Sequence, residues 1–126
     1  MSSINRFQKL VADAKSRIKE ITVQDYLAQT RDKKPLLIDV REDSDWQQGH
    51  AQDAVHLNRG VIELKIEEKI PDVTTPIVCY CGGGSRSALV ADSLQKMGYT
   101  NVLSLAGGYK AWTETGSPVS READRK

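Results

Sequence analysis

The chain has 126 residues, of which 39% are hydrophobic and 28% are charged, and its formal net charge is +1. This composition is typical of one globular domain with a single core, and Lys and Arg alternate with Asp and Glu throughout, which leaves no basic surface for nucleic acid. No apolar run reaches membrane-spanning length and the first residues do not form a secretory signal, so we expect no membrane partner and a cytoplasmic location.

The first 20 residues are expected to form an accessory amphipathic helix outside the main domain. Apolar side chains recur in this segment every three or four positions, as they do along one face of a helix, at Ile4, Phe7, Leu10, Val11, Ala14 and Ile18. A short strand at 21–23 and a second helix follow. Thr22 is suited to cap that helix, with Asp25 at its third position.

Apolar and amphipathic segments alternate in the middle of the chain. The run PLLIDV (35–40) predicts a buried strand, and REDSDWQQG (41–49) predicts a helix that ends at its glycine. AVHL (54–57) predicts a short strand, and RGVIELKIEEKI (59–70) predicts a further helix. TPIVCY (75–80) is the most hydrophobic strand candidate.

The C-terminal part continues this alternation. SRSALVADSLQKMG (85–98) predicts a helix, NVLSLA (101–106) a strand and GGYKAWTETG (107–116) a helix, while SREADRK (120–126) predicts a charged, flexible tail. Strands that alternate with helices at this spacing indicate an α/β domain with a parallel sheet covered on both faces. In such sheets ligands bind at the carboxyl ends of the strands, which is where Cys81 lies.

The loop after Cys81 has the composition of an anion-binding turn. Glycines between a strand and a helix allow several backbone N–H groups to point toward one atom, and the N-terminus of the following helix adds partial positive charge. Such surroundings can lower the pKa of a cysteine from about 8.5 to roughly 3.5–7.5. The sequence therefore predicts that Cys81 is an activated nucleophile. The loop around it consists of Gly82, Gly83, Gly84, Ser85 and Arg86.

Other roles for the two cysteines have less support. A cysteine at a strand end is commonly a small buried apolar residue, an interpretation that suits Cys79 better than Cys81. Their Cα atoms would be about 6.6 Å apart on one extended run, near the upper limit for a disulfide, and this spacing also weakens a redox switch between them. His50 and His56 do not supply the ligand spacing of a zinc site, so we expect no metal and no cofactor.

Three motifs in this order resemble those of the rhodanese family. CGGGSRS (81–87) is similar to its active-site loop, LLIDVREDSDWQQGHAQDAVHL (36–57) to its upstream signature, and VLSLAGGYKAWTETGSPV (102–119) to its C-terminal signature. The matching residues outside the loop are Asp39, Arg41, Gly49, His50, Gly107, Gly108, Trp112 and Pro118. The resemblance covers residues 21–119 and implies a three-layer domain with a central, mainly parallel five-stranded sheet flanked by helices.

The resemblance also implies a sulfurtransferase. Cys81 would take one sulfur atom from a donor such as thiosulfate, hold it as a persulfide, and pass it to cyanide, a thiol or a protein acceptor. Transfer through a covalent enzyme predicts ping-pong kinetics, and the N–H groups of residues 82–86 would hold the persulfide. Some relatives that use thiosulfate carry additional cations in the active-site loop or in the helix after the DVR-like strand. The chain has glycines in the loop, and Asp43, Ser44 and Asp45 in the helix. A protein persulfide or an organic polysulfide is therefore an alternative donor.

The remaining candidate residues have structural alternatives. Arg86 is expected either to bind an anionic donor or to pair with a nearby acid. Arg59 and Asp39 are expected at the rim of the pocket, although Arg59 has helical spacing to Glu63 and Asp39 could instead pair with Arg41. Structural roles are expected for Ser85, Ser87, Trp46, His50 and Trp112.

Two other classes of function are compatible with the resemblance. Cell-cycle dual-specificity phosphatases share the fold and use a cysteine loop that ends in arginine, but their loop has one residue more between the two than Cys81 and Arg86 have. One residue fewer shortens the loop by up to about 3.5 Å of contour, which suits a single sulfur better than a phosphate. A non-catalytic interaction or sulfur-carrier module is the second class, and the intact cysteine loop argues against it.

Overall fold

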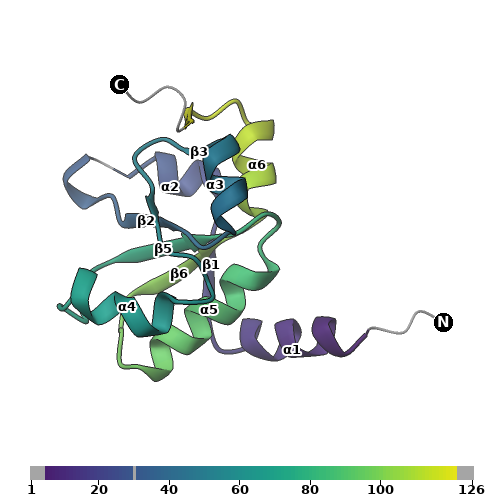
Figure 1. The fold of residues 1–126 in the computed structure, drawn as a ribbon, viewed down its shortest axis with the longest axis vertical. Helices are drawn as coiled ribbons and strands as arrows, with labels where there is room; N and C mark the ends of the chain where they lie inside the picture. The colour runs from purple at the N-terminus through teal and green to yellow at the C-terminus, as the bar shows by residue number, and fades with distance from the viewer. Residues whose placement is uncertain (1–4, 30, 122–126) are drawn as a thin grey trace.

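The computed structural model describes residues 5–29 and 31–121, which alternate between helices and strands (Figure 1). The helices are α1 (Arg6–Lys15), α2 (Val23–Leu27), α3 (Asp43–Gln48), α4 (Ile62–Lys69), α5 (Ser85–Lys96) and α6 (Gly108–Glu114), with a 3₁₀ turn η1 (Arg31–Lys33). The strands are β1 (Lys19–Ile21), β2 (Leu36–Asp39), β3 (His50–Ala51), β4 (Val55–His56), β5 (Ile77–Tyr80), β6 (Val102–Leu105) and β7 (Val119–Ser120). Within the described ranges, none of the helices has the length and apolar character needed to cross a membrane.

Five strands form one sheet in the order β1-β6-β5-β2-β4, and every pairing in it is parallel. This confirms the expected α/β architecture with a central five-stranded sheet. β3 and β7 form a separate antiparallel pair, in which His50 lies opposite Ser120. The sequence does not predict this pair, and Ser120, expected to begin the flexible tail, belongs to a strand. Residues 122–126 of that tail lie outside the described residues.

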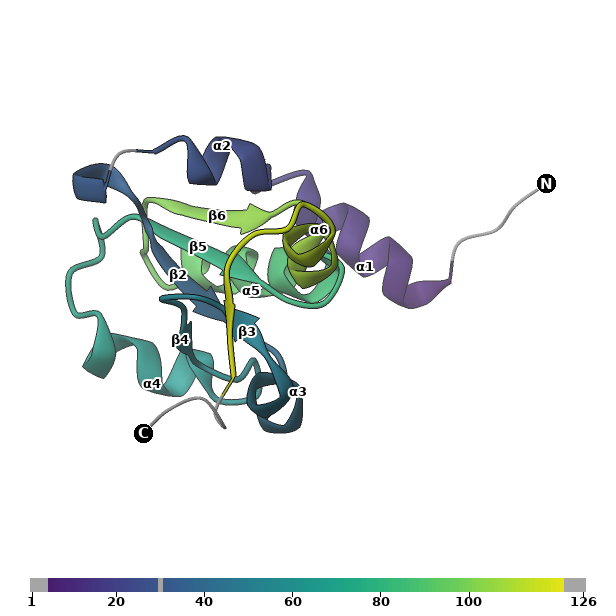
Figure 2. The same ribbon diagram turned by 90° about the horizontal axis from the view of Figure 1, so that it is seen from above.

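The side chains of β5 point alternately to the two faces of the sheet, as they do in any strand. Ile77, Cys79 and Cys81 pack in the core on the side of α4 and α5. Val78 and Tyr80 pack in the other core, on the side of α2, α3 and α6. Figure 1 shows the sheet between these two groups of helices, and Figure 2 looks onto it from the side of α6, with α5 behind. β5 is thus held in the middle of the domain, and the loop that follows starts from a fixed point.

Helix α1 lies on the outside of the domain, with its C-terminal end beside α5 and its N-terminal end pointing away from the sheet (Figure 1). Val11 and Ala14 are the buried residues of α1. Just beyond the helix, Arg17 donates two hydrogen bonds to the carboxylate of Asp92 on α5, at 3.0 and 2.8 Å. These contacts fix the position of the N-terminal helix relative to α5.

Several element boundaries differ from the prediction. The N-terminal helix, expected over residues 1–20, ends at Lys15, and the helix expected over 41–49 is Asp43–Gln48. The first strand is Lys19–Ile21 rather than 21–23, so the expected border after residue 20 falls inside β1, which pairs with β6. α4 begins at Ile62 rather than at residue 59. A turn precedes it, in which the Asn58 side chain accepts a hydrogen bond from the N–H of Gly60 at 2.7 Å, and this turn delays the start of the helix.

Candidate active site

Cys81 occupies the junction between the central strand and α5. β5 ends one residue before it, at Tyr80, and α5 begins four residues after it, at Ser85. The Cys81 side chain is 3% exposed, and both Cys79 and Cys81 are free cysteines. The residue therefore lies at the carboxyl end of the sheet, where the sequence places it.

The sulfur of Cys81 is surrounded by hydrogen-bonding groups. The backbone N–H of Gly84 donates to Sγ at 3.1 Å. The thiol lies 3.5 Å from Oγ of Ser87, to which it donates, and the direction reverses when the sulfur becomes a thiolate. Oγ of Ser87 also forms a 2.7 Å hydrogen bond with Oγ of Ser104 on β6. Both serines are fully buried, so this chain of hydroxyls is shielded from water.

These donors lower the pKa of Cys81. Burial on its own raises the pKa, because the thiolate loses its hydration. The hydroxyl of Ser87 lowers it, as do the backbone N–H groups of Ser87, Gly84 and Gly83. The hydrogen bonds outweigh the burial, so the thiolate is favoured at a lower pH than in a free cysteine. This lowered pKa is the electrostatic property expected of an activated nucleophile.

The three loop glycines are not equivalent. Gly84 has φ of +102°, and a Cβ there would lie 3.3 Å from the backbone nitrogen of Gly107. Gly82 and Gly83 are not in the left-handed region, and a Cβ on either would meet nothing within 4 Å. Positive φ and close approach are therefore found at Gly84, whose N–H contacts the sulfur, and not at Gly82 or Gly83.

The start of α6 holds the cysteine loop from the other side. The N–H of Tyr109 donates to the carbonyl of Cys81 at 2.8 Å, and that of Lys110 donates to the carbonyl of Gly82 at 3.0 Å. A Cβ on Gly108 would lie only 2.5 Å from the carbonyl oxygen of Cys81. Gly108 thus allows α6 to approach the loop closely enough for these hydrogen bonds.

A pocket of about 300 Å³ opens beside the sulfur. The cysteine loop forms one wall of it, through Cys81, Gly82, Gly83, Ser85 and Arg86. Gly84 is buried beneath this wall. Five of the six predicted loop residues therefore line the same pocket, and the sixth supports it from below.

The opposite wall comes from two distant parts of the chain. The segment after β2 contributes Arg41, Glu42 and Asp45, and α1 contributes Phe7. Arg41 carries a positive charge and the other two polar residues carry negative charges, so the wall has no net positive field for an anion. In the described part of the chain, no group of three or more metal-ligating side chains gathers here or elsewhere.

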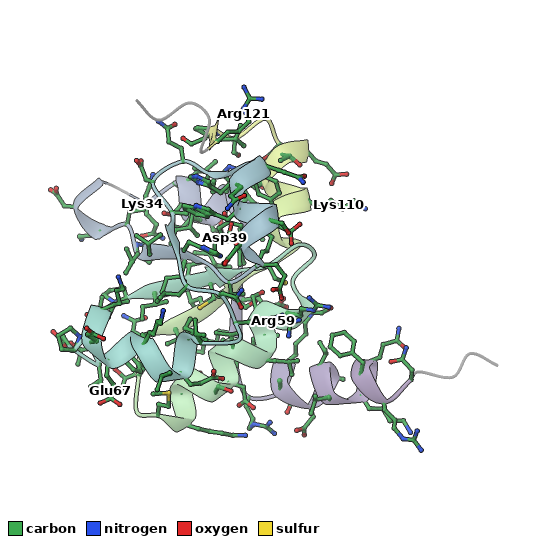
Figure 3. All side chains as sticks on the ribbon, viewed as in Figure 1. Lys34, Asp39, Arg59, Glu67, Lys110 and Arg121 are labelled. Atoms are coloured by element: carbon green, nitrogen blue, oxygen red, sulfur yellow. The ribbon has the colours of Figure 1, made fainter. Side chains whose placement is uncertain are left out.

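Asp39 supports the pocket from below instead of lining its rim. It is fully buried and lies in the middle of the molecule (Figure 3). Its carboxylate accepts hydrogen bonds from Nη2 of Arg41 at 2.9 Å and from the hydroxyl of Tyr80 at 2.6 Å. The rim position expected for Asp39 is therefore wrong, and the alternative, a pairing with Arg41, is the arrangement found. Through this pairing Asp39 fixes the guanidinium of Arg41, which does line the pocket.

Of the two remaining cations, Arg86 lines the pocket and Arg59 lies beside it. Arg86 is exposed, and the described residues contain no ion pair that involves it, so the expected pairing with an acid is not found there. Arg59 precedes α4 and pairs with Glu42 at 3.4 Å. It lies between α4 and α1 (Figure 3) and lines a neighbouring hollow together with Arg86 and Glu63.

Three contributors to the site are not predicted from the sequence. Only a structural role is expected for Ser87, yet it contacts the sulfur. Ser104 has a recognisable signal, because it is a polar residue in the apolar strand VLSL. Phe7 has none, because its place on the helix predicts an apolar contact but does not indicate which part of the domain the helix meets.

Comparisons with known proteins agree with this arrangement. A family model described as the rhodanese-like domain matches residues 22–115. A sulfurtransferase from Allochromatium vinosum is 37% identical over 93 residues, which are 74% of this chain and 83% of the relative. The family model spans the cysteine loop, the upstream motif and all but the last four residues of the C-terminal motif.

Two solved structures share the fold over most of the length of this chain. A protein of unknown function from Rhodopseudomonas palustris, described as a possible tyrosine phosphatase, superposes with a TM-score of 0.79 at 28% identity, over 95% of this chain and 98% of that one. The homodimeric polysulfide-sulfur transferase from Wolinella succinogenes gives a TM-score of 0.78 at 24% identity, over 94% and 90% of the two chains. At that identity the second likeness shows the fold alone.

Proposed function

We propose, since the chain belongs to the rhodanese-like domain family, that Cys81 accepts a sulfane sulfur as a persulfide and passes it to a thiophilic acceptor. The family match and the sulfurtransferase relative support sulfur transfer as the class of reaction. Thiosulfate is the simplest donor, and cyanide or a thiol is the acceptor. A protein thiol is a further candidate acceptor.

The observation that carries this proposal is the set of donors around the sulfur. The N–H of Gly84 at 3.1 Å and the hydroxyl of Ser87 at 3.5 Å surround Sγ of Cys81, and its pKa is lowered in spite of burial. A nucleophilic sulfur must be a thiolate to attack. The same donors would stabilise the negative charge of a persulfide one bond further out.

Both half-reactions balance without a metal or an external oxidant. The Cys81 thiolate attacks the outer sulfur of thiosulfate, the S–S bond of the donor breaks, and sulfite leaves with the bonding pair. Cyanide then attacks the outer sulfur of the persulfide, the enzyme S–S bond breaks, and thiocyanate leaves as the Cys81 thiolate is restored. Charge is conserved in each step, and no proton is required.

The charges of the pocket are compatible with two classes of sulfur donor. Arg41 is already neutralised by Asp39, and Glu42 and Asp45 add negative charge to the wall. Arg86 is then the cation left to attract a dianion such as thiosulfate. This balance supports a protein persulfide or an organic polysulfide as the second donor class.

A cysteine-dependent phosphatase is the second candidate function, because one relative of the same fold is described as a possible tyrosine phosphatase. Four residues separate Cys81 from Arg86, a loop better suited to a single sulfur than to a phosphate. We therefore expect no hydrolysis of p-nitrophenyl phosphate. A Cys81-dependent phosphatase activity would reverse the order of the two candidates.

Intact-protein mass spectrometry under non-reducing conditions tests the proposal. The protein is measured before and after incubation with thiosulfate or with a polysulfide, beside the C81S variant. We expect a gain of one sulfur atom that cyanide removes and that the variant does not show. If neither donor adds sulfur to the wild type, the sulfurtransferase proposal fails and a non-catalytic interaction module becomes the better account.

A further inference from the structure

A second, smaller hollow adjoins the catalytic pocket. Its volume is about 190 Å³, and it shares Phe7 and Arg86 with the pocket of about 300 Å³ that contains Cys81. The rest of its lining comes from Arg59, Glu63, Leu89, Val90 and Ser93. Because the two hollows share two side chains, they lie directly next to each other.

The helix that closes this hollow has a defined position. Phe7 on α1 is 45% exposed, although a large aromatic side chain gains from burial. Two turns further along, Ala14 is 1% exposed, and Arg17 holds the carboxylate of Asp92 with two hydrogen bonds. α1 is therefore attached to α5, and Phe7 stands over the hollow as an apolar wall that a ligand could cover.

The chemistry of the hollow differs from that of the cysteine loop. Phe7, Leu89 and Val90 supply apolar surface. Arg59 and Arg86 supply two guanidinium groups against the single carboxylate of Glu63, so the charged lining is net positive. Arg86 makes no ion pair within the described residues, and the Arg59 side chain is 41% exposed with a single partner at 3.4 Å. Guanidinium groups beside apolar surface suit a carboxylate on a short organic stem. Thiosulfate and cyanide are too small to need this second space.

We propose that the second hollow binds the non-reacting part of an organic thiol that carries a carboxylate, while its sulfur reaches Cys81. This inference rests on the proposed sulfurtransferase function. The acceptor thiolate attacks the outer sulfur of the Cys81 persulfide, the enzyme S–S bond breaks, and the Cys81 thiolate is restored. The acceptor leaves as an organic persulfide. Nothing is oxidised or reduced overall, and the reverse reaction loads Cys81 from an organic persulfide.

The selectivity of the 126-residue chain for different sulfur acceptors tests this role of the second hollow. Three acceptors are compared on the persulfide-loaded enzyme: glutathione, its diethyl ester, in which both carboxylates are blocked, and cyanide. For the wild type we expect kcat/KM to be about three- to fivefold higher for glutathione than for the ester, the effect of one partly exposed charge pair. In Arg59→Gln this preference should disappear. Lys65→Gln removes an exposed cation of α4 that lies outside the hollow, and it should keep the preference.

A second pair of variants tests whether transfer to the organic thiol needs the second hollow to be open. Ser93→Phe fills the hollow from α5, whereas Ser93→Ala leaves it open at the same position. We expect the ratio of kcat/KM for glutathione to that for cyanide to fall about tenfold in Ser93→Phe, the effect of a misplaced substrate, and to be kept in Ser93→Ala.

Equal rates for glutathione and its ester in the wild type, or an unchanged glutathione-to-cyanide ratio in Ser93→Phe, would overturn the inference. These outcomes are distinguishable from a failure of the proposed function, because sulfur loading of Cys81 is measured first by mass. An enzyme that loads sulfur but shows no acceptor preference keeps its function and loses the subsite.

Discussion

Two cysteines on the same face of the same core show how a small change of position creates a reactive site. Cys79 is the third residue of β5, paired in register with Ile38 on β2 and Ser104 on β6. Cys81 is the first residue beyond the strand. Both are almost completely buried, yet burial, together with the charge of Cys81, raises the pKa of Cys79 to about 12, whereas the pKa of Cys81 is lowered.

The difference lies in the direction of the backbone donors. Inside the sheet, N–H groups are used in the hydrogen bonds between strands, and a side chain such as Cys79 meets apolar neighbours. Past the end of the strand the chain turns, and the N–H of Gly84 points at the sulfur of Cys81. Burial then destabilises the thiolate less, because hydrogen-bond donors of the protein replace the water molecules that the thiolate loses.

The largest difference in activity should appear when each of the two cysteines is replaced separately. Cys81→Ser should lower sulfur transfer by about a thousandfold or more, since the nucleophile is lost. Cys79→Ala should keep the transfer rate and cost about 1 kcal/mol of unfolding free energy through lost apolar contacts. Steady-state transfer and urea unfolding measure the two effects. A large loss of transfer in Cys79→Ala with normal stability would show that the strand cysteine takes part.

A methyl group in the loop should have the next largest effect. Gly84→Ala puts a Cβ on a residue with φ of +102° and 3.3 Å from the nitrogen of Gly107. We expect a loss of about 1–3 kcal/mol of stability and at least a tenfold loss of transfer, because one donor to the anionic sulfur is displaced. Gly83→Ala is the matched control, since its Cβ would meet nothing within 4 Å. Equal losses in both variants would contradict this account of the loop.

The two regions also differ in how well the sequence predicts them. The strand that contains Cys79 is recognisable from its apolar run, and the position of Cys81 follows from the glycines, because both patterns are local. The tertiary contacts to Cys81 and its pocket are not local. Ser104 reaches Ser87 from another strand, and Phe7 reaches the pocket from a helix outside the matched domain. Such contacts depend on packing, which periodicity alone does not specify.

The hydroxyl of Ser87 should account for part of the difference in pKa. Ser87→Ala removes a hydrogen bond to the thiolate worth about 1 kcal/mol, so the Cys81 pKa should rise. Alkylation of Cys81 by iodoacetamide near neutral pH should then slow about three- to fivefold. The pH at half-maximal alkylation measures the shift directly. An unchanged profile would assign the lowered pKa to the backbone donors alone.

Ser87→Ala should also change how the free energy of unfolding depends on pH. Because the folded-state pKa of Cys81 lies below that of the unfolded chain, ionisation stabilises the fold fully above pH about 8.5. This contribution is lost as the pH falls through the folded-state pKa. Ser87→Ala should therefore reduce the gain in unfolding free energy between neutral and mildly alkaline pH, with Cys81→Ser as the reference without the titrating group.

The smallest effect should come from Ser104→Ala, which removes a group that does not contact the sulfur. Ser104 lies 2.7 Å from the Ser87 hydroxyl, and as a donor to that oxygen it would leave the Ser87 proton free to point at Sγ. We expect the Cys81 pKa to rise by only a few tenths of a unit, with about a twofold slower alkylation. The double variant Ser87→Ala/Ser104→Ala completes the cycle. If Ser104 acts only by orienting Ser87, the double variant should alkylate at the rate of Ser87→Ala, whereas additive effects would mean that Ser104 acts on the sulfur independently.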